Sequence, residues 1–303
     1  MTGCVGRAGL TRLDAGLKGN VMVDHTAVPP ELTGPTRHLL LSPHYDDIPL
    51  SVGATVRLLA NHNLAPEVFV VFGSEPDRAQ PLTDFARAMH EVWGLSAEEV
   101  IARRQAEERA AEGMLGAELH LLPFRDAIYR GAQYRSDDDL FGEPVAAEVM
   151  LPAELAAALP LPAEPEPRTR IYAPLGVGRH VDHQLVFRAG LDLQSRGWEV
   201  WLYEDIPYAL KPEALERRIA EIGQQIPIET VASIPAEEGW EAKLDAILSY
   251  PSQLETVFRQ YVGVGTSRDE IGAALAEYAG RGSDGHMKER FWQVVRSANP
   301  GGS

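Results

Sequence analysis

The sequence predicts an α/β fold: a Rossmann-like, mostly parallel sheet with helices on both faces, followed by a helical C-terminal region. Two observations predict this class. Apolar runs rich in β-branched and aromatic residues alternate along the chain with helical segments of about 10–15 residues, as in strands joined by crossover helices. Of the 303 residues, 45% are hydrophobic and 24% are charged, which is the composition of a globular chain that can bury a full core.

Five strands are predicted from short apolar runs that turn residues bound on both sides. The first is the run HLLLS at 38–42, and the second is EVFVVF at 67–72. The other strands are predicted at 118–122, 170–173 and 198–203, with a late addition at 230–234. Helices are predicted at 50–60, at two segments between the second and third strands (the second at 96–115), at 183–193, and at 238–261 and 268–280 in the C-terminal region.

The chain is expected to form one domain with an irregular beginning and one insertion. Residues 1–36 have no sustained periodicity and contain Pro29-Pro30 and Gly34-Pro35, so they are expected to form an N-terminal tail or arm. Residues 37–303 are expected to form a single α/β domain. Within that domain, 130–167 breaks the pattern with three consecutive aspartates and several closely spaced prolines, which predicts an insertion outside the core.

The charge balance and the single cysteine exclude several classes of protein. The chain has 28 basic and 44 acidic residues, and its formal charge of -16 would repel both a nucleic-acid backbone and an anionic membrane surface. Cys4 alone allows neither an intramolecular disulfide nor a cysteine zinc site. Because a signal peptide and a long apolar segment are also lacking, we expect a cytoplasmic protein without nucleic-acid or membrane partners.

Two groups of polar residues directly follow predicted strands. His44, Asp46 and Asp47 come after the first strand, and His180 and His183 come after the fourth. Either group alone has an ordinary explanation, because paired aspartates often cap helices and a single histidine is usually a surface or core residue. The two groups meet, however, if the first and fourth strands adjoin at the point where the strand order reverses. Imidazoles and a carboxylate then form a three-ligand zinc site with an open position, which indicates hydrolysis.

The same residues carry a resemblance to a known family. His44-Tyr45-Asp46-Asp47 and His180-Val181-Asp182-His183 resemble the His-Pro-Asp-Asp and His-x-Asp-His motifs of the PIG-L (LmbE-like) N-deacetylase family, which removes N-acetyl groups from N-acetylglucosamine-containing substrates. The resemblance spans most of the chain. Further segments that look like the family are Arg104-x-x-Glu107, the stretch 203–207 and the stretch 243–253.

The resemblance implies a role for each of these side chains. His44, Asp47 and His183 would bind Zn2+, although another divalent metal such as Fe2+ also fits. Asp46 would be the general base that takes a proton from the attacking water, and His180 would stabilise the oxyanion. The group that protonates the leaving amine is left open between Asp46 and His180.

Substrate contacts follow from the resemblance as well, and each has a structural alternative. The positions that lie near the sugar in the family correspond to Glu75, Arg104 and Asp126. Arg104 could instead form an intrahelical ion pair with Glu107, and Glu75 could be a solvated turn residue. Tyr45 replaces the proline of the family motif, and its ring is expected to pack against the sheet instead of entering the pocket.

The predicted function is zinc-dependent hydrolysis of the acetamide of an N-acetylated amino sugar or of its glycoside or conjugate. Two alternatives are kept: an amidase that removes a larger acyl group from a sugar conjugate, and a non-catalytic, metal-containing carbohydrate-binding protein. The expected partner is a small amino-sugar substrate, and the resemblance implies a homo-oligomer.

Overall fold

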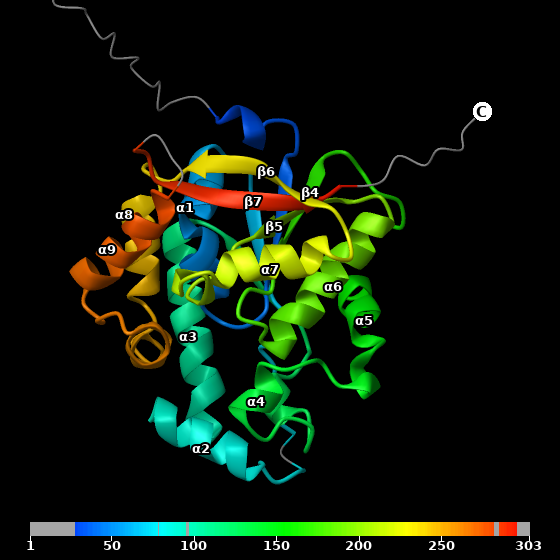
Figure 1. Cartoon of the computed structure of the whole chain (residues 1–303), viewed down its shortest axis with the longest axis vertical. Coiled ribbons are helices and arrows are strands. Elements are labelled where there is room, and N and C mark those ends of the chain that lie inside the picture. Colours follow the sequence, from blue (N-terminus) through cyan, green and yellow to red (C-terminus); the bar gives the residue numbers. More distant parts are fainter. Residues whose placement is uncertain (1–27, 78, 95–96, 282–284, 296–303) are drawn as a thin grey trace, which may run out of the picture.

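A sheet of seven strands in the order β3-β2-β1-β4-β5-β7-β6 forms the centre of the computed structural model, which describes residues 28–77, 79–94, 97–281 and 285–295 (Figure 1). The strands are β1 (Arg37–Ser42), β2 (Pro66–Val70), β3 (Glu118–Leu121), β4 (Thr169–Pro174), β5 (Glu199–Tyr203), β6 (Ile228–Pro235) and β7 (Lys288–Val294). β1 to β5 pair in parallel, and β7 pairs antiparallel with both β5 and β6. The predicted mostly parallel sheet is therefore confirmed, and β7 is a strand that the sequence patterns did not indicate.

Helices cover both faces of this sheet. They are α1 (Asp47–Asn61), α2 (Asp84–Trp93), α3 (Ala97–Leu115), α4 (Asp137–Leu140), α5 (Leu151–Ala157), α6 (Val181–Ser195), α7 (Ala214–Gly223), α8 (Trp240–Ile247) and α9 (Arg268–Ala279), with a π-helix at Glu255–Gln260. In Figure 1, α2 and α4 lie at the end of the molecule opposite to β6 and β7. The predicted helical character of the C-terminal region is found in α7, α8 and α9.

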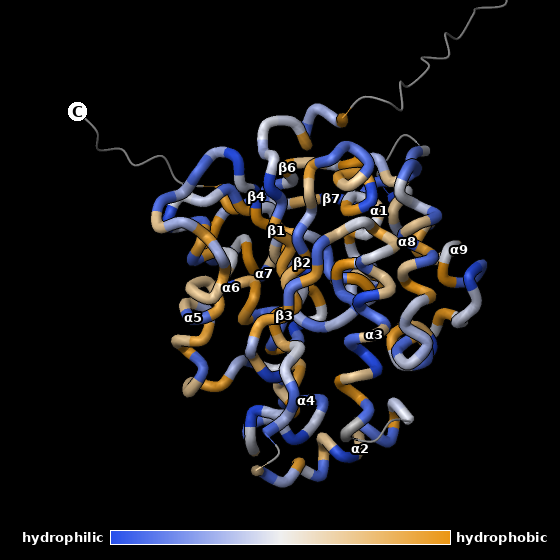
Figure 2. Tube along the Cα trace, turned by 180° about the vertical axis from the view of Figure 1, so that it is seen from behind, coloured by the Kyte–Doolittle hydropathy of each residue, from blue (hydrophilic) through white to orange (hydrophobic). Residues whose placement is uncertain are grey.

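The core is divided by the sheet, because successive side chains of a strand point to opposite faces. On β1, Leu39 and Leu41 pack with side chains of α5 and α6, whereas Leu40 packs with side chains of α1, α3 and α8. Figure 2 shows the apolar colour concentrated in the central strands and the hydrophilic colour in the α4 region. Within the described residues, every helix is too short or too polar to traverse a bilayer.

The segment 130–167 contributes to the core, contrary to expectation. Its helix α5 buries Leu155 and Ala156 in the same apolar cluster as Val186 of α6. The end of the predicted N-terminal arm also packs, because Leu32 is fully buried and the Arg170 side chain donates to the backbone oxygen of Glu31. Cys4 lies outside the described residues.

Helix α1 contains a break that another part of the chain stabilises. Val52 has φ -133°, which is not helical, and the freed N–H groups of Ala54 and Thr55 donate to the Glu289 carboxylate of β7 at 3.2 and 2.7 Å. Lys243 of α8 forms an ion pair with Glu289 at 2.6 Å. The part of α1 that follows the break is thus held by the C-terminal strand.

Candidate active site

The loop after β1 places the first group of predicted residues in a tight turn. The Ser42 hydroxyl donates to the His44 carbonyl oxygen at 2.7 Å, and the His44 N–H donates to the Asp47 carboxylate at 2.8 Å. Asp46 immediately precedes α1 with φ 87°, in the left-handed region that non-glycine residues seldom occupy. Such a conformation persists only where surrounding contacts hold it.

The loop after β4 brings the second group to the same edge of the sheet, because β1 and β4 are direct neighbours. His180 caps α6 by accepting the Asp182 N–H at its Nδ1, 3.2 Å away, and His183 lies fully buried in the first turn of that helix. Gly178 in this loop has φ +84°, and a Cβ there would lie 2.4 Å from the Tyr208 ring. Only glycine fits this close approach.

The predicted metal ligands converge. Asp47 Oδ2 lies 3.4 Å from His183 Nε2 and 3.7 Å from His44 Nδ1. The potential ligand atoms of His44, His180 and His183 also lie within 4.8 Å of one another. His183 Nε2 is buried and has no hydrogen-bond partner among the described residues, which is costly for a polar atom unless it binds something else. Two imidazoles and one carboxylate suit a divalent metal such as Zn2+, so the donor set fits the predicted cofactor.

Two further carboxylates orient the histidines. Asp205, after β5, contacts His183 Nδ1 at 2.7 Å and accepts the Val177 N–H at 3.0 Å. Metal-binding histidines usually pair with a carboxylate or carbonyl through the second ring nitrogen, so this pairing leaves Nε2 for the metal. Asp205 had no predicted role, although its place at the end of a strand beside β4 is the signal that could have found it.

Asp182 supports His44 in the same way. Its carboxylate contacts His44 Nε2 at 2.8 Å, accepts the Ala127 N–H at 3.0 Å and pairs with Arg130 at 2.6 Å. Burial alone would raise the pKa of Asp182, but the Arg130 guanidinium and His44 outweigh it and hold this pKa well below its usual value. The carboxylate is therefore charged, which favours a fixed orientation of His44.

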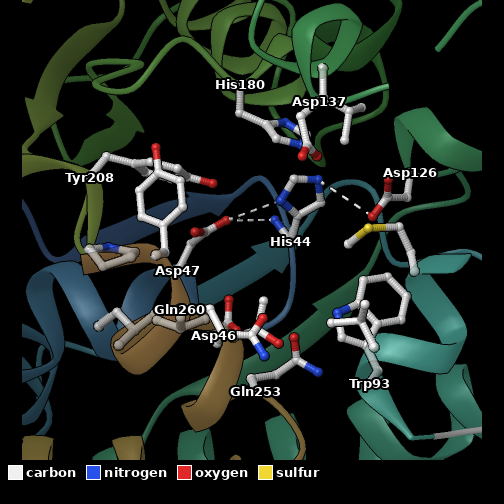
Figure 3. A pocket seen from close by; sticks show the side chains of 18 of the residues that line it. His44, Asp46, Asp47, Trp93, Asp126, Asp137, His180, Tyr208, Gln253 and Gln260 are labelled. Atoms are coloured by element: carbon white, nitrogen blue, oxygen red, sulfur yellow. Dashed lines mark hydrogen bonds and ion pairs between the residues drawn. The ribbon is translucent and has the colours of Figure 1, made fainter. Parts of the chain in front are cut away.

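Asp46 lines the cavity (Figure 3), and Arg104 Nη2 of α3 lies 3.9 Å from Asp46 Oδ2. Burial raises the pKa of Asp46 well above its usual value, and the Arg104 charge opposes this only in part. The alternative pairing of Arg104 with Glu107 is not formed, because Glu107 contacts Arg103 at 2.9 Å and the Ser252 hydroxyl at 2.5 Å. The guanidinium lies over the rings of Tyr45 and Trp93, 5.4 Å from each centroid.

A side chain that sequence reasoning missed reaches the backbone of this loop. Glu108 of α3 is fully buried, and its Oε2 accepts the Asp46 N–H at 2.9 Å and the Tyr250 hydroxyl at 2.7 Å. Burial raises the pKa of Glu108 to about 7. Its position one helical turn after Arg104 places it on the same face of α3, which was the available signal.

A cavity of about 580 Å³ is lined by five of these residues: His44, Asp46, Asp47, Arg104 and His180. Asp126 lines the cavity with Oδ2 3.7 Å from His44 Nε2. Asp137 also lines it, and Figure 3 shows this side chain on the same side as His180. The remaining lining includes the aromatic residues Trp93, Phe141, Tyr208 and Tyr261.

The other sequence-predicted residues lie elsewhere. Glu75 is exposed and is not among the residues that line the cavity, so its contact with substrate stays a prediction. Tyr45 is 1% exposed and its hydroxyl donates to the Gly73 carbonyl oxygen, which confirms that this ring packs in the interior instead of entering the cavity.

Comparison with known proteins agrees with this site. The PIG-L family model, described as GlcNAc-PI de-N-acetylase, matches residues 39–194. A 2'-N-acetylparomamine deacetylase of Niallia circulans is 33% identical over 186 residues, which are 56% of this chain and 66% of that protein. A protein of the same name from Streptomyces fradiae is 30% identical over 230 residues, 72% of this chain and 74% of that protein. The alignment thus spans just under two thirds of the first relative's length.

Solved structures show the same fold. The zinc-inhibited form of a teicoplanin deacetylase has a TM-score of 0.64 and 26% identity, and the match covers 87% of this chain and 99% of that one. The A40926 pseudoaglycone deacetylase has a TM-score of 0.60 and 28% identity, covering 87% and 98%. The paired motifs, their convergence at one edge of the sheet and these matches agree, and the chain belongs to the PIG-L family.

Proposed function

We propose that the chain is a zinc-dependent N-deacetylase that hydrolyses the acetamide of an N-acetylated amino-sugar conjugate. The observation that carries this proposal is the meeting of His44, Asp47 and His183 beside the cavity. Among the described residues, the buried His183 Nε2 has no hydrogen-bond partner. Asp46 and His180 line the same cavity and supply the acid–base and oxyanion groups that amide hydrolysis needs. The deacetylase names of the relatives support the same reaction.

In the proposed mechanism, His44, Asp47 and His183 would hold zinc. When bound, zinc would polarise the amide and lower the pKa of water, so that a nucleophile is available near neutral pH. Asp46 takes the proton of the attacking water. His180 accepts a backbone N–H at Nδ1, so its own proton is on Nε2, where it can donate to the developing oxyanion.

The proton balance then identifies the donor to the leaving amine. Since the single proton of a neutral His180 is engaged by the oxyanion, Asp46 passes the proton that it gained to the amine nitrogen. The C–N bond breaks, and acetate and the free amino sugar are the products. Arg104, beside Asp46, and Asp126, beside His44, are proposed to contact the sugar hydroxyls.

The outer wall of the cavity favours a sugar that carries a second ring. Tyr261 stacks on Phe141 with centroids 5.9 Å apart and meets Tyr208 edge-on at 5.0 Å. Three converging aromatic rings suit the apolar face of a cyclic substituent, and the cavity volume is in the range that accepts a drug-sized ligand. We therefore propose an N-acetylated amino-sugar conjugate with a second ring. The names of the two relatives specify 2'-N-acetylparomamine as the compound that those proteins deacetylate.

The test begins with the purified protein. It should carry about one zinc per chain and release acetate from N-acetylglucosamine conjugates, and Asp46→Asn should keep the metal and lose turnover. A panel of acyl lengths separates a deacetylase from an amidase for larger acyl groups, since the deacetylase should be fastest on acetyl. Tight binding of the acetylated sugar without acetate release under any divalent metal would instead support a carbohydrate-binding protein.

We also propose that residues 37–303 act as one domain and that the protein works in the cytoplasm as a homo-oligomer. The formal charge of -16 argues against nucleic acid or anionic lipid as a partner.

A further inference from the structure

Glu108 takes no part in the mechanism above, yet its carboxylate contacts the main chain of the proposed base. Glu108 Oε2 accepts the Asp46 N–H at 2.9 Å and the Tyr250 hydroxyl at 2.7 Å. Both donors use the same oxygen, and within the described part of the chain Oε1 has no hydrogen-bond partner. The side chain is fully buried on α3, so these two bonds are made without competition from bulk water.

The residue that receives this contact needs support. Asp46 has φ 87° and ψ -23°, a left-handed backbone that costs energy for a residue with a Cβ. As the residue before α1, it cannot give its N–H to a helical carbonyl, and it is 6% exposed. Without Glu108, this N–H would be a buried donor with no partner, and the turn would lose the contact that opposes its relaxation.

The same face of α3 also contacts the Asp46 side chain. Arg104, one turn before Glu108, lies 3.9 Å from Asp46 Oδ2 and donates to the Tyr45 carbonyl oxygen at 3.4 Å. Two side chains four residues apart on one helix thus hold the base at both its main chain and its carboxylate. Because Asp46 is contacted at its N–H and near its carboxylate, its side chain has little freedom to rotate. A general base needs such a fixed geometry.

We propose that Glu108 is a positioning residue whose carboxylate holds the Asp46 main chain in the left-handed conformation that aims the Asp46 side chain at the attacking water. The inference rests on the proposed function, because it assumes that Asp46 is the base. It concerns the rate of the chemical step and predicts that metal binding and substrate affinity are little affected.

The experiment compares Glu108→Leu with Glu108→Gln in the zinc-loaded enzyme. The leucine variant removes the acceptor, and displacement of the base by about 1 Å should lower kcat by roughly 10- to 100-fold while KM changes by less than about threefold. Glutamine keeps one carbonyl oxygen for both donors, so Glu108→Gln should restore kcat to within about threefold of the wild type. Zinc content should be unchanged in both variants.

Glu112 provides a matched control. It lies one turn further along α3 and is fully buried, and in the part of the chain that the structure describes neither of its carboxylate oxygens has a hydrogen-bond partner. Glu112→Leu should therefore leave kcat unchanged. Wild-type kcat in a folded, zinc-loaded Glu108→Leu variant would overturn the proposal, as would an equal loss in Glu112→Leu.

If Glu108→Leu does not fold, the structure of the wild-type protein still tests the proposal. A crystal structure of the wild-type zinc enzyme should show Asp46 with positive φ and its nitrogen within about 3.2 Å of Glu108. A separation beyond hydrogen-bond distance would overturn the proposal even if the enzyme is an active deacetylase, whereas a wild-type enzyme without acetate release would instead refute the proposed function.

Discussion

Replacing Lys243 by methionine should be among the most destabilising single changes in this chain. Lys243 and Glu289 are 3% and 5% exposed and form an ion pair at 2.6 Å. The Lys243 ammonium also donates to the Ser51 carbonyl oxygen at 3.1 Å. Removing one partner of a buried pair leaves the other charge uncompensated, which typically costs about 3–5 kcal/mol. Methionine keeps most of the volume of the lysine, so the loss should come from the charge and not from a cavity.

The measurement is the free energy of unfolding in urea for Lys243→Met, Glu289→Gln and the double variant. The N–H groups of Ala54 and Thr55 donate to different oxygens of Glu289, Oε1 and Oε2. Glutamine at position 289 keeps one acceptor oxygen, so it removes the charge and one of these two backbone hydrogen bonds. The double variant buries no unpaired charge, so it should be more stable than Lys243→Met by at least about 2 kcal/mol. A loss below about 1 kcal/mol in Lys243→Met, or a double variant as unstable as the single one, would refute this reasoning.

Three further changes test other parts of the structure. Asp205→Asn should weaken zinc binding by about 10- to 100-fold, because the carboxylate that orients His183 is lost, and unchanged affinity in dialysis against a zinc buffer would contradict that role. Tyr261→Ala should raise KM for a two-ring conjugate by about 2- to 10-fold and leave hydrolysis of N-acetylglucosamine itself unaffected; an equal effect on both substrates would exclude a separate subsite. Burial lowers the pKa of His38 to about 4 from 6.5, with the Arg170 charge adding to the effect. The unfolded chain therefore binds this proton first as the pH falls, and about 3 kcal/mol of stability is lost between pH 6.5 and pH 4. His38→Gln should flatten the stability curve over this interval, and an unchanged slope in urea titrations at several pH values would show that His38 is not responsible.

The parallel part of the fold and the meeting of the candidate metal ligands could be predicted because their signals are local. Leu39 to Leu41 form a buried run, and the residues directly after such a strand lie at a predictable edge of the sheet. The neighbouring positions of β1 and β4 follow from the usual strand order of this fold class, so His44 and His183 could be expected to meet.

The residues that support the site could not be predicted, because their partners are distant in sequence. Glu289 contacts Ala54 across 235 positions, and Glu108 contacts Tyr250 across 142. Strand β7, which carries Glu289, is only partly buried, so it lacks the continuous apolar run that indicates a central strand. An acidic residue that is fully buried on a helix looks from sequence like any solvated glutamate.

The Arg130–Asp182–His44 contact links the cavity wall to the candidate metal ligands. Arg130 begins the segment that supplies Asp137 and Phe141 to the cavity wall, and its charge holds the carboxylate that orients His44. Replacing this segment with that of a relative would be one way to change the substrate range. The replacement would also remove the Arg130 charge that holds Asp182 beside His44. Chimeras that retain Arg130 should still bind zinc. Chimeras without Arg130 would need another basic residue that pairs with Asp182.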